Sequence, residues 1–141
     1  MLVELLTAAL FVPITVMVHG TGLFWLARAL RLVGAEERRR HVGMDSLTGT
    51  LGLLAIVMGL FALHGLEIWG WGVAYYLLGA IDDLRTAVYV SCFTYSTLGY
   101  DMSAVPEPWR LLVAIEGITG ILLLGWTTGF FVAVVVRVRA A

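Results

Sequence analysis

Three long apolar segments constrain the fold of this chain more than any other feature of its sequence. They cover about residues 5–32, 47–66 and 109–138. A run of about 20 apolar residues is long enough to cross a bilayer as an α-helix. Hydrophobic residues make up 60% of the 141 residues and charged residues only 13%, which leaves too little polar surface to coat a soluble globule. The sequence therefore predicts an all-α membrane protein with three transmembrane helices.

The first apolar segment has to be distinguished from a signal peptide. Its start carries Glu4 in place of a basic cluster, and its apolar run is longer than the core of a signal peptide. We therefore expect residues 1–33 to form a transmembrane helix of the mature protein.

The placement of arginine predicts the orientation of the chain. Arginines are concentrated around the connector at residues 34–45 and at the end of the chain, whereas the second connector has only Arg85 and Arg110. The positive-inside rule then places the basic linker 34–45 and the C-terminus in the cytoplasm and the N-terminus outside. Every basic residue except histidine is arginine, which is typical of a GC-rich genome and favours a bacterial source. We therefore expect a multi-pass protein of the plasma membrane, the inner membrane of a bacterium.

A short helix is predicted between the second and third apolar segments. Asp82 and Asp83 can cap a helix from Leu84 to Tyr95, since carboxylates at a helix N-terminus accept hydrogen bonds from free backbone amides. With about 12 residues, this helix is too short to span a bilayer. Bare backbone cannot face lipid, so the glycine-containing turn after it must line a protein cavity or an aqueous path.

The letters of that turn carry a resemblance to a known family. Thr97-Leu98-Gly99-Tyr100 resembles the Thr-Val-Gly-Tyr core of potassium-channel selectivity filters. The resemblance covers residues 82–138 and is to small bacterial pore-loop potassium channels, with an extra N-terminal helix in this chain. It implies a pore domain over residues 46–141, made of an outer helix 46–68, a re-entrant pore helix 83–95, a filter loop 96–102 and an inner helix 108–138.

The resemblance also implies an assembly and a function. A filter of this kind needs a strand-like backbone whose carbonyls surround one axis, and one chain supplies only one such row. A homotetramer with C4 symmetry is therefore expected. The expected function is passive conduction of a monovalent cation, K⁺, without catalysis and without a cofactor. Expected partners are further copies of the chain and the lipid bilayer; a net charge of -1 gives nucleic acid no basic surface.

The same resemblance assigns roles to the residues of the turn. The residues that bind the ion are expected to be Thr97, Leu98, Gly99, Tyr100 and Asp101, and those that support the filter to be Thr94, Ser96 and Met102.

The family pattern continues with Gly-Asp after the tyrosine, whereas this chain has Asp101-Met102. If both residues are substitutions, Asp101 keeps the left-handed turn and adds a carboxylate at the outer mouth. Met102 then replaces a hydrogen-bonding carboxylate with a weak acceptor. If one residue is deleted, Asp101 keeps the family role and the carbonyl row is one site shorter. The altered filter also leaves open a non-conducting structural or regulatory protein whose filter has collapsed.

Two glycines and one carboxylate in the last apolar segment are further candidates. The resemblance places a gating hinge near Gly117 and Gly120, while close packing of helices is the simpler interpretation. Glu116 lies about two turns inside the segment, where a charge needs a partner or water. Arg110 is its candidate partner in the sequence.

Histidines inside the first two apolar segments suggest a different class of site. His64 and Glu67 share a helical face, which favours a local hydrogen bond over metal coordination or proton sensing. His19 is expected to form a hydrogen bond with a neighbouring helix. A metal or haem protein that uses these residues and Glu116 is the competing function, although the preferred reading has no metal other than the permeant cation.

Overall fold

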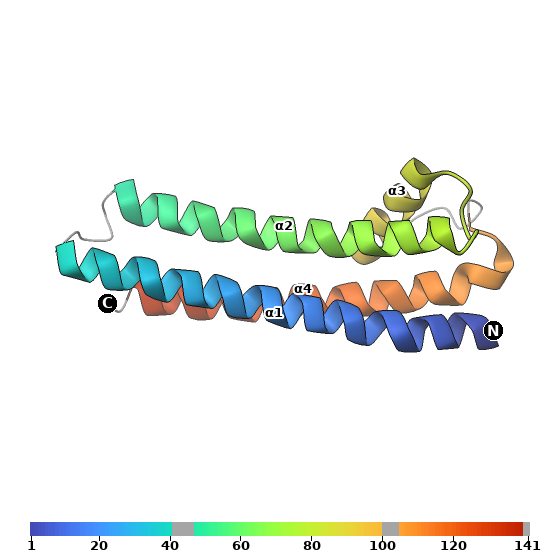
Figure 1. Cartoon of the computed structure of the whole chain (residues 1–141), viewed down its shortest axis with the longest axis horizontal. Helices are drawn as coiled ribbons and strands as arrows, with labels where there is room; N and C mark the ends of the chain where they lie inside the picture. The colour runs from blue at the N-terminus through green and yellow to red at the C-terminus, as the bar shows by residue number, and fades with distance from the viewer. Residues whose placement is uncertain (41–46, 100–104, 140–141) are drawn as a thin grey trace.

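The structure, a computed structural model, describes residues 1–40, 47–99 and 105–139. These residues form three long helices, α1 (Leu2–Arg40), α2 (Leu47–Leu77) and α4 (Arg110–Arg139), and one short helix, α3 (Leu84–Tyr95). A 3₁₀ turn over Glu107–Trp109 leads into α4. The long helices run side by side, and α3 lies at the end of the bundle that holds the N-terminus (Figure 1).

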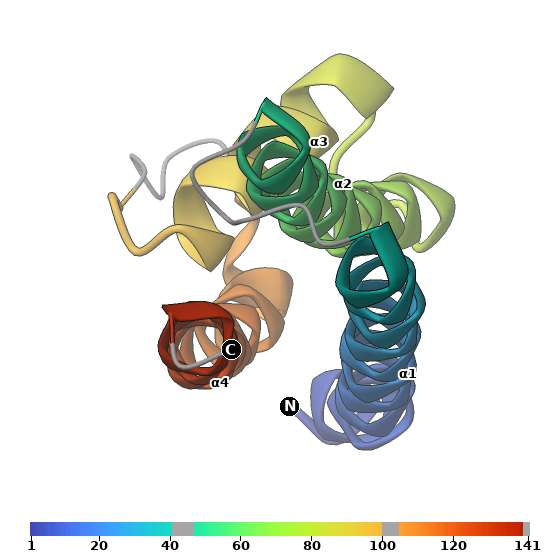
Figure 2. The same ribbon diagram turned by 90° about the vertical axis from the view of Figure 1, so that its left-hand side faces the viewer.

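Figure 2 shows the arrangement of the four helices from one end of the bundle. α1 packs against both α2 and α4, and α3 packs against the same two helices. The larger hydrophobic cluster forms where all four helices meet and includes Ala8, Trp71, Val90 and Leu112. α3 is therefore held between α2 and α4 on the side away from α1.

The three long helices confirm the predicted transmembrane segments. The stretches that are long and apolar enough to span a membrane are Leu2–Arg31, Thr50–Leu77 and Glu107–Val136. Only between 17% and 22% of the most apolar part of each span is buried within the chain. Most of this apolar surface therefore faces outward, where lipid or another chain must cover it.

Two helices extend beyond their predicted ends. α1 continues to Arg40, so the prediction of a linker is wrong for residues 34–40, where glutamate and arginine are good helix formers. α2 continues to Leu77 instead of ending at residue 68, because its aromatic and glycine-rich last part has no proline to stop it. Residues 41–45 of the predicted linker lie outside the described residues. α4 begins at Arg110, two residues after the predicted start at 108, because the 3₁₀ turn comes first.

The short helix α3 has the predicted bounds and the predicted cap. The carboxylate of Asp83 accepts hydrogen bonds from the Thr86 backbone N–H at 2.8 Å and from the Thr86 hydroxyl at 2.7 Å. The backbone of α3 also lies close to that of α2, since a Cβ on Gly72 of α2 would lie 2.7 Å from the Cα of Val88 in α3. The capped helix is therefore seated directly on the backbone of α2.

We expect the Asp83→Ala variant to lower the thermal unfolding temperature slightly, whereas Asp82→Ala, at an exposed neighbouring position, does not. Hydrogen bonds from Thr86 lower the pKa of Asp83. The stabilisation is therefore complete above the ordinary aspartate pKa and is lost as the pH falls through the lowered pKa of the folded state. Thermal unfolding of both variants at neutral and acidic pH measures this. Equal effects of the two substitutions would contradict the assignment of the cap.

Candidate functional site

α3 ends in a turn that reverses the chain at Ser96. The Thr97 backbone N–H donates to the Thr94 carbonyl at 3.0 Å, and the Leu98 N–H donates to the Phe93 carbonyl at 3.1 Å. This pair of bonds is the Schellman pattern that closes many helix C-termini. Thr97 takes the left-handed position of the motif, with φ of 61°. The turn that was singled out in the sequence is thus also the C-terminal cap of α3.

The backbone of this turn differs from the expected strand-like form. Thr97 and Gly99 both have positive φ, 61° and 77°. A β-branched residue in this region is unusual and costs about 1–2 kcal/mol. The expectation of an extended backbone is wrong for Thr97 and Gly99, because their segment closes the end of a helix. Tyr100, Asp101 and Met102, the other predicted filter residues, lie outside the described residues.

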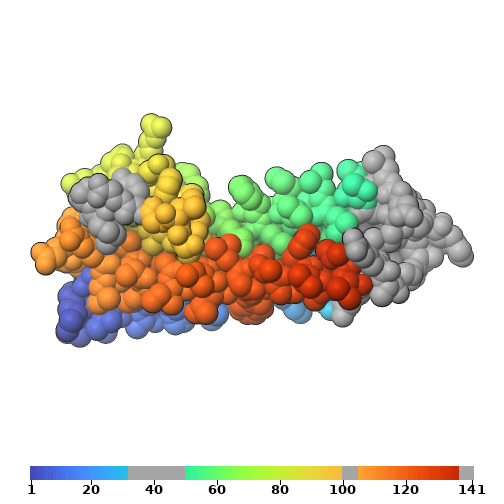
Figure 3. Space-filling model, turned by 180° about the vertical axis from the view of Figure 1, so that it is seen from behind, coloured from blue at the N-terminus to red at the C-terminus, as the bar shows by residue number. Residues whose placement is uncertain are grey.

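The turn is exposed in the single chain. Thr97, Leu98 and Gly99 are all exposed, and 75% of Leu98 is accessible. The space-filling view places the end of α3, in yellow and gold, on the surface above α4 (Figure 3). Of the predicted support residues, Ser96 donates its hydroxyl to the Cys92 carbonyl at 2.6 Å. The carbonyl of Thr94 accepts from Thr97 as described above.

Gly117 and Gly120 lie where α4 meets the end of α3. A Cβ on Gly120 would lie 2.3 Å from the carbonyl oxygen of Tyr95, and one on Gly117 would lie 3.5 Å from that of Thr94. At about 1.5 Å per residue, Gly120 is about 15 Å along α4 from Arg110. The end of α3 therefore lies well inside the length of the bundle, as a re-entrant helix requires. Close packing accounts for Gly120, whereas Gly117 has room for a Cβ, and the predicted hinge stays a prediction.

Glu116 connects three helices at this end of the bundle. Its side chain is fully buried and accepts hydrogen bonds from the hydroxyls of Tyr75 in α2 and Ser91 in α3. The predicted ion pair with Arg110 is wrong, since Arg110 donates its Nε to the Val105 carbonyl at 3.1 Å. Side chains share a helical face at spacings of three or four, and the spacing between these two residues turns them apart.

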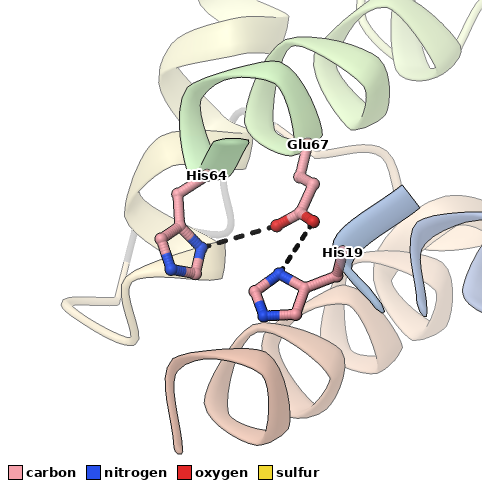
Figure 4. A group of neighbouring side chains, drawn as sticks. All are labelled: His19, His64 and Glu67. Carbon is pink, nitrogen blue, oxygen red and sulfur yellow. Dashed lines mark hydrogen bonds and ion pairs between the residues drawn. The ribbon is translucent and has the colours of Figure 1, made fainter. Parts of the chain in front are cut away.

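A second buried polar group lies deeper and joins all four helices. Glu67 Oε1 lies 2.9 Å from His19 Nδ1, and its Oε2 lies 3.4 Å from His64 Nδ1 (Figure 4). The hydroxyl of Tyr95, the last residue of α3, donates to the same carboxylate. On the α4 side, Thr127 Oγ1 lies 2.9 Å from His64 Nε2 and 3.2 Å from His19 Nε2. We call these five residues the His-Glu cluster.

Sequence reasoning found parts of this cluster and missed its centre. The contact between His64 and Glu67 and the hydrogen bond of His19 to a neighbouring helix are both confirmed. The convergence of both histidines on one carboxylate was not predicted, nor were Tyr95 and Thr127. The signal available in the sequence was that polar residues within membrane spans usually pair with one another.

One comparison with known proteins identifies a relationship. The sequence model of a family described as "ion channel" matches residues 61–137, which is more than half of the chain. The match begins in α2 and includes α3, the turn after it and most of α4, while α1 lies outside it. No curated protein and no solved structure shows significant similarity to the chain.

Proposed function

The chain belongs to this ion channel family, and from that premise we propose that it forms a homotetrameric cation channel that conducts K⁺. The backbone carbonyls of Thr97 to Tyr100 form the selectivity filter, with positive φ at Thr97 and Gly99 in place of a strand-like backbone and with Asp101 and Met102 at the outer mouth. Conduction itself involves no catalysis and no cofactor.

The observation that carries this proposal is an exposed, non-helical turn that a re-entrant helix holds within the length of the bundle. Leu98 in this turn is 75% accessible, whereas Tyr95, the last residue of α3, is buried against α4. Backbone N–H and C=O groups cannot face hydrocarbon. Further copies of the chain around an axis would remove this surface from lipid and leave an aqueous path along the axis.

Two features of the helices support that assembly. The C-terminus of α3 carries the negative end of the helix dipole, which favours a cation near the turn. Gly125 and Gly129 in α4 are exposed, with no atom within 4 Å of a Cβ placed on either. Their spacing is the small-xxx-small pattern, which lets a helix of another chain approach closely.

The membrane orientation belongs to the same proposal. The N-terminus and α3 lie at one end of the bundle and the C-terminus at the other (Figure 1). With the arginine-rich end in the cytoplasm, the turn opens to the outside of a bacterial inner membrane. Four Asp101 carboxylates would then surround the outer mouth.

Potassium flux into liposomes, with sodium as the comparator, tests the proposal through Gly99→Ala. Gly99 has φ of 77° and open space around its Cβ position, so alanine is disfavoured there by its backbone alone. The cost of about 1–2 kcal/mol lowers the population of this turn conformation by about 10-fold, since about 1.4 kcal/mol is a tenfold change in an equilibrium constant. If only this conformation conducts, K⁺ flux falls by about the same factor. Gly79→Ala is the matched control, because Gly79 has φ of 67° and equal space but lies in the turn between α2 and α3.

Each result has a distinct meaning. Selective K⁺ flux that falls in Gly99→Ala but not in Gly79→Ala supports a working filter at Thr97 to Tyr100. Flux without selectivity means that Asp101-Met102 widens the pore. No flux from an assembled tetramer favours the non-conducting alternative, and a stable monomer in mild detergent contradicts the channel.

A further inference from the structure

The His-Glu cluster contains three potential metal ligands from two helices. His19 in α1 and His64 and Glu67 in α2 each place a ligand atom within 4.8 Å of the others. Figure 4 shows the two imidazoles directed at the carboxylate. We propose that these side chains bind one Zn²⁺ ion per chain, in a site that is separate from the path of the permeant ion. The inference goes beyond conduction and does not depend on it.

The spacing of the ligand atoms fits a tetrahedral zinc ion. Zinc binds imidazole nitrogen and carboxylate oxygen at about 2.0–2.2 Å, so neighbouring ligands in a tetrahedron lie about 3.3 Å apart. The distance from His19 Nδ1 to Glu67 Oε1 is 2.9 Å, and that from His64 Nδ1 to the other carboxylate oxygen, Oε2, is 3.4 Å. One ligand atom from each of the three residues lies within 4.8 Å of the other two. Small side-chain movements would therefore bring all three donors into coordination distance.

The outer nitrogens of both histidines are held as a metal site requires. A ligating imidazole usually donates its other N–H to a fixed acceptor, which sets the tautomer and the ring orientation. Here both Nε2 atoms lie near the Thr127 hydroxyl, at 3.2 Å for His19 and 2.9 Å for His64. A hydroxyl oxygen has two lone pairs and can accept from both rings. With zinc bound, both Nδ1 lone pairs are then free to bind the ion, which replaces the proton that His19 Nδ1 donates to Glu67 in the hydrogen bond of the metal-free protein.

The hydroxyl of Tyr95 lies next to the position of a fourth zinc ligand. Tyr95 Oη lies 2.9 Å from His64 Nδ1 and also contacts Glu67. Two imidazoles, one carboxylate and either this hydroxyl or a water complete a four-coordinate zinc ion. Because Tyr95 is the last residue of α3, an ion here would fasten the end of the pore helix to α1 and α2.

Charge also favours a cation at this position. Glu67 is 4% exposed and lies inside the span Thr50–Leu77. Among the described residues, the side chains that contact its carboxylate are His19, His64 and Tyr95, and none of them carries a permanent positive charge. A carboxylate within the membrane is costly unless it is compensated. A divalent ion would compensate this negative charge and leave a net charge of +1, which binding of Tyr95 as a phenolate would neutralise.

Zinc binding to the intact, tag-free protein in detergent tests the proposal. Protein treated with a chelator is titrated with Zn²⁺ against a chromogenic competitor, and bound zinc is measured by mass spectrometry. We expect one Zn²⁺ per chain, a thermal unfolding temperature that rises with Zn²⁺, and loss of both effects in His19→Asn and His64→Asn. Thr127→Val should weaken binding by about 10-fold to 100-fold, the range for removal of such a hydrogen-bond partner.

Glu116→Gln is the matched control, because Glu116 is another buried carboxylate that contacts α2 and α3 but lies outside the cluster. It should bind Zn²⁺ as the unchanged protein does. Absence of stoichiometric binding by the folded protein overturns the proposal, as does unchanged binding in both histidine variants. If those variants fail to fold, unchanged affinity in Thr127→Val overturns it. Potassium flux measured in chelator separates this outcome from that of the channel proposal.

Discussion

The Gly120→Ala variant is expected to lose K⁺ flux and to unfold at a lower temperature, because alanine has no room at this position. Its Cβ would lie 2.3 Å from the Tyr95 carbonyl oxygen and 2.9 Å from the Tyr95 Cα. These are backbone atoms, so no side-chain rotation relieves the clash. Overpacking of this kind costs about 1–3 kcal/mol. The end of α3 must move away from α4, and the turn at Thr97 moves with it.

Another glycine of α4 provides a control. At Gly117 the nearest atom lies 3.5 Å from the Cβ position, an ordinary contact. We therefore expect Gly117→Ala to retain stability and flux. A gating hinge at Gly117 would give a different result, with flux altered in Gly117→Ala at unchanged stability. Normal flux and stability in Gly120→Ala would contradict the close packing of α3 on α4.

Among variants that replace one buried polar residue outside the His-Glu cluster with alanine, Glu116→Ala should have the lowest thermal unfolding temperature. Glu116 is fully buried and accepts hydrogen bonds from Tyr75 and Ser91. Its removal leaves the buried Tyr75 hydroxyl without this acceptor and opens a cavity, at a combined cost of roughly 2–5 kcal/mol. Thermal unfolding of the purified protein measures the loss. Because the side chain joins α4 to both α2 and α3, K⁺ flux should fall as well.

Glu116→Gln separates the hydrogen bonds from the charge. The amide oxygen can accept from Tyr75, and the amide nitrogen can donate to Ser91, whose hydroxyl can instead donate to the Ile68 carbonyl at 2.9 Å. We therefore expect Glu116→Gln to remain close to the unchanged protein. A loss as large as in Glu116→Ala would mean that the negative charge itself is required. Arg110→Ala should have little effect, because Arg110 does not pair with Glu116.

The sequence alone determined the features that depend on local properties of the chain. Hydropathy located the three spans, because crossing a bilayer requires a long continuous apolar segment. The bounds of α3 followed from its cap, since Asp83 acts on the backbone of its own first turn. The position of the turn at Thr97 followed from the same local reasoning, and the family match over residues 61–137 agrees with the channel resemblance.

Only the tertiary structure decided which polar groups meet. His19 and Glu67 are 48 residues apart, and His19 and Thr127 are 108 apart, so no local spacing joins them. The long helices are apolar on nearly every face, and a helix without an apolar stripe does not reveal which side packs inward. The rotation and stacking of the helices bring Glu116 into contact with Tyr75 and Ser91 instead of Arg110. They also place Gly120 against the end of α3. Those rotations depend on contacts between distant segments.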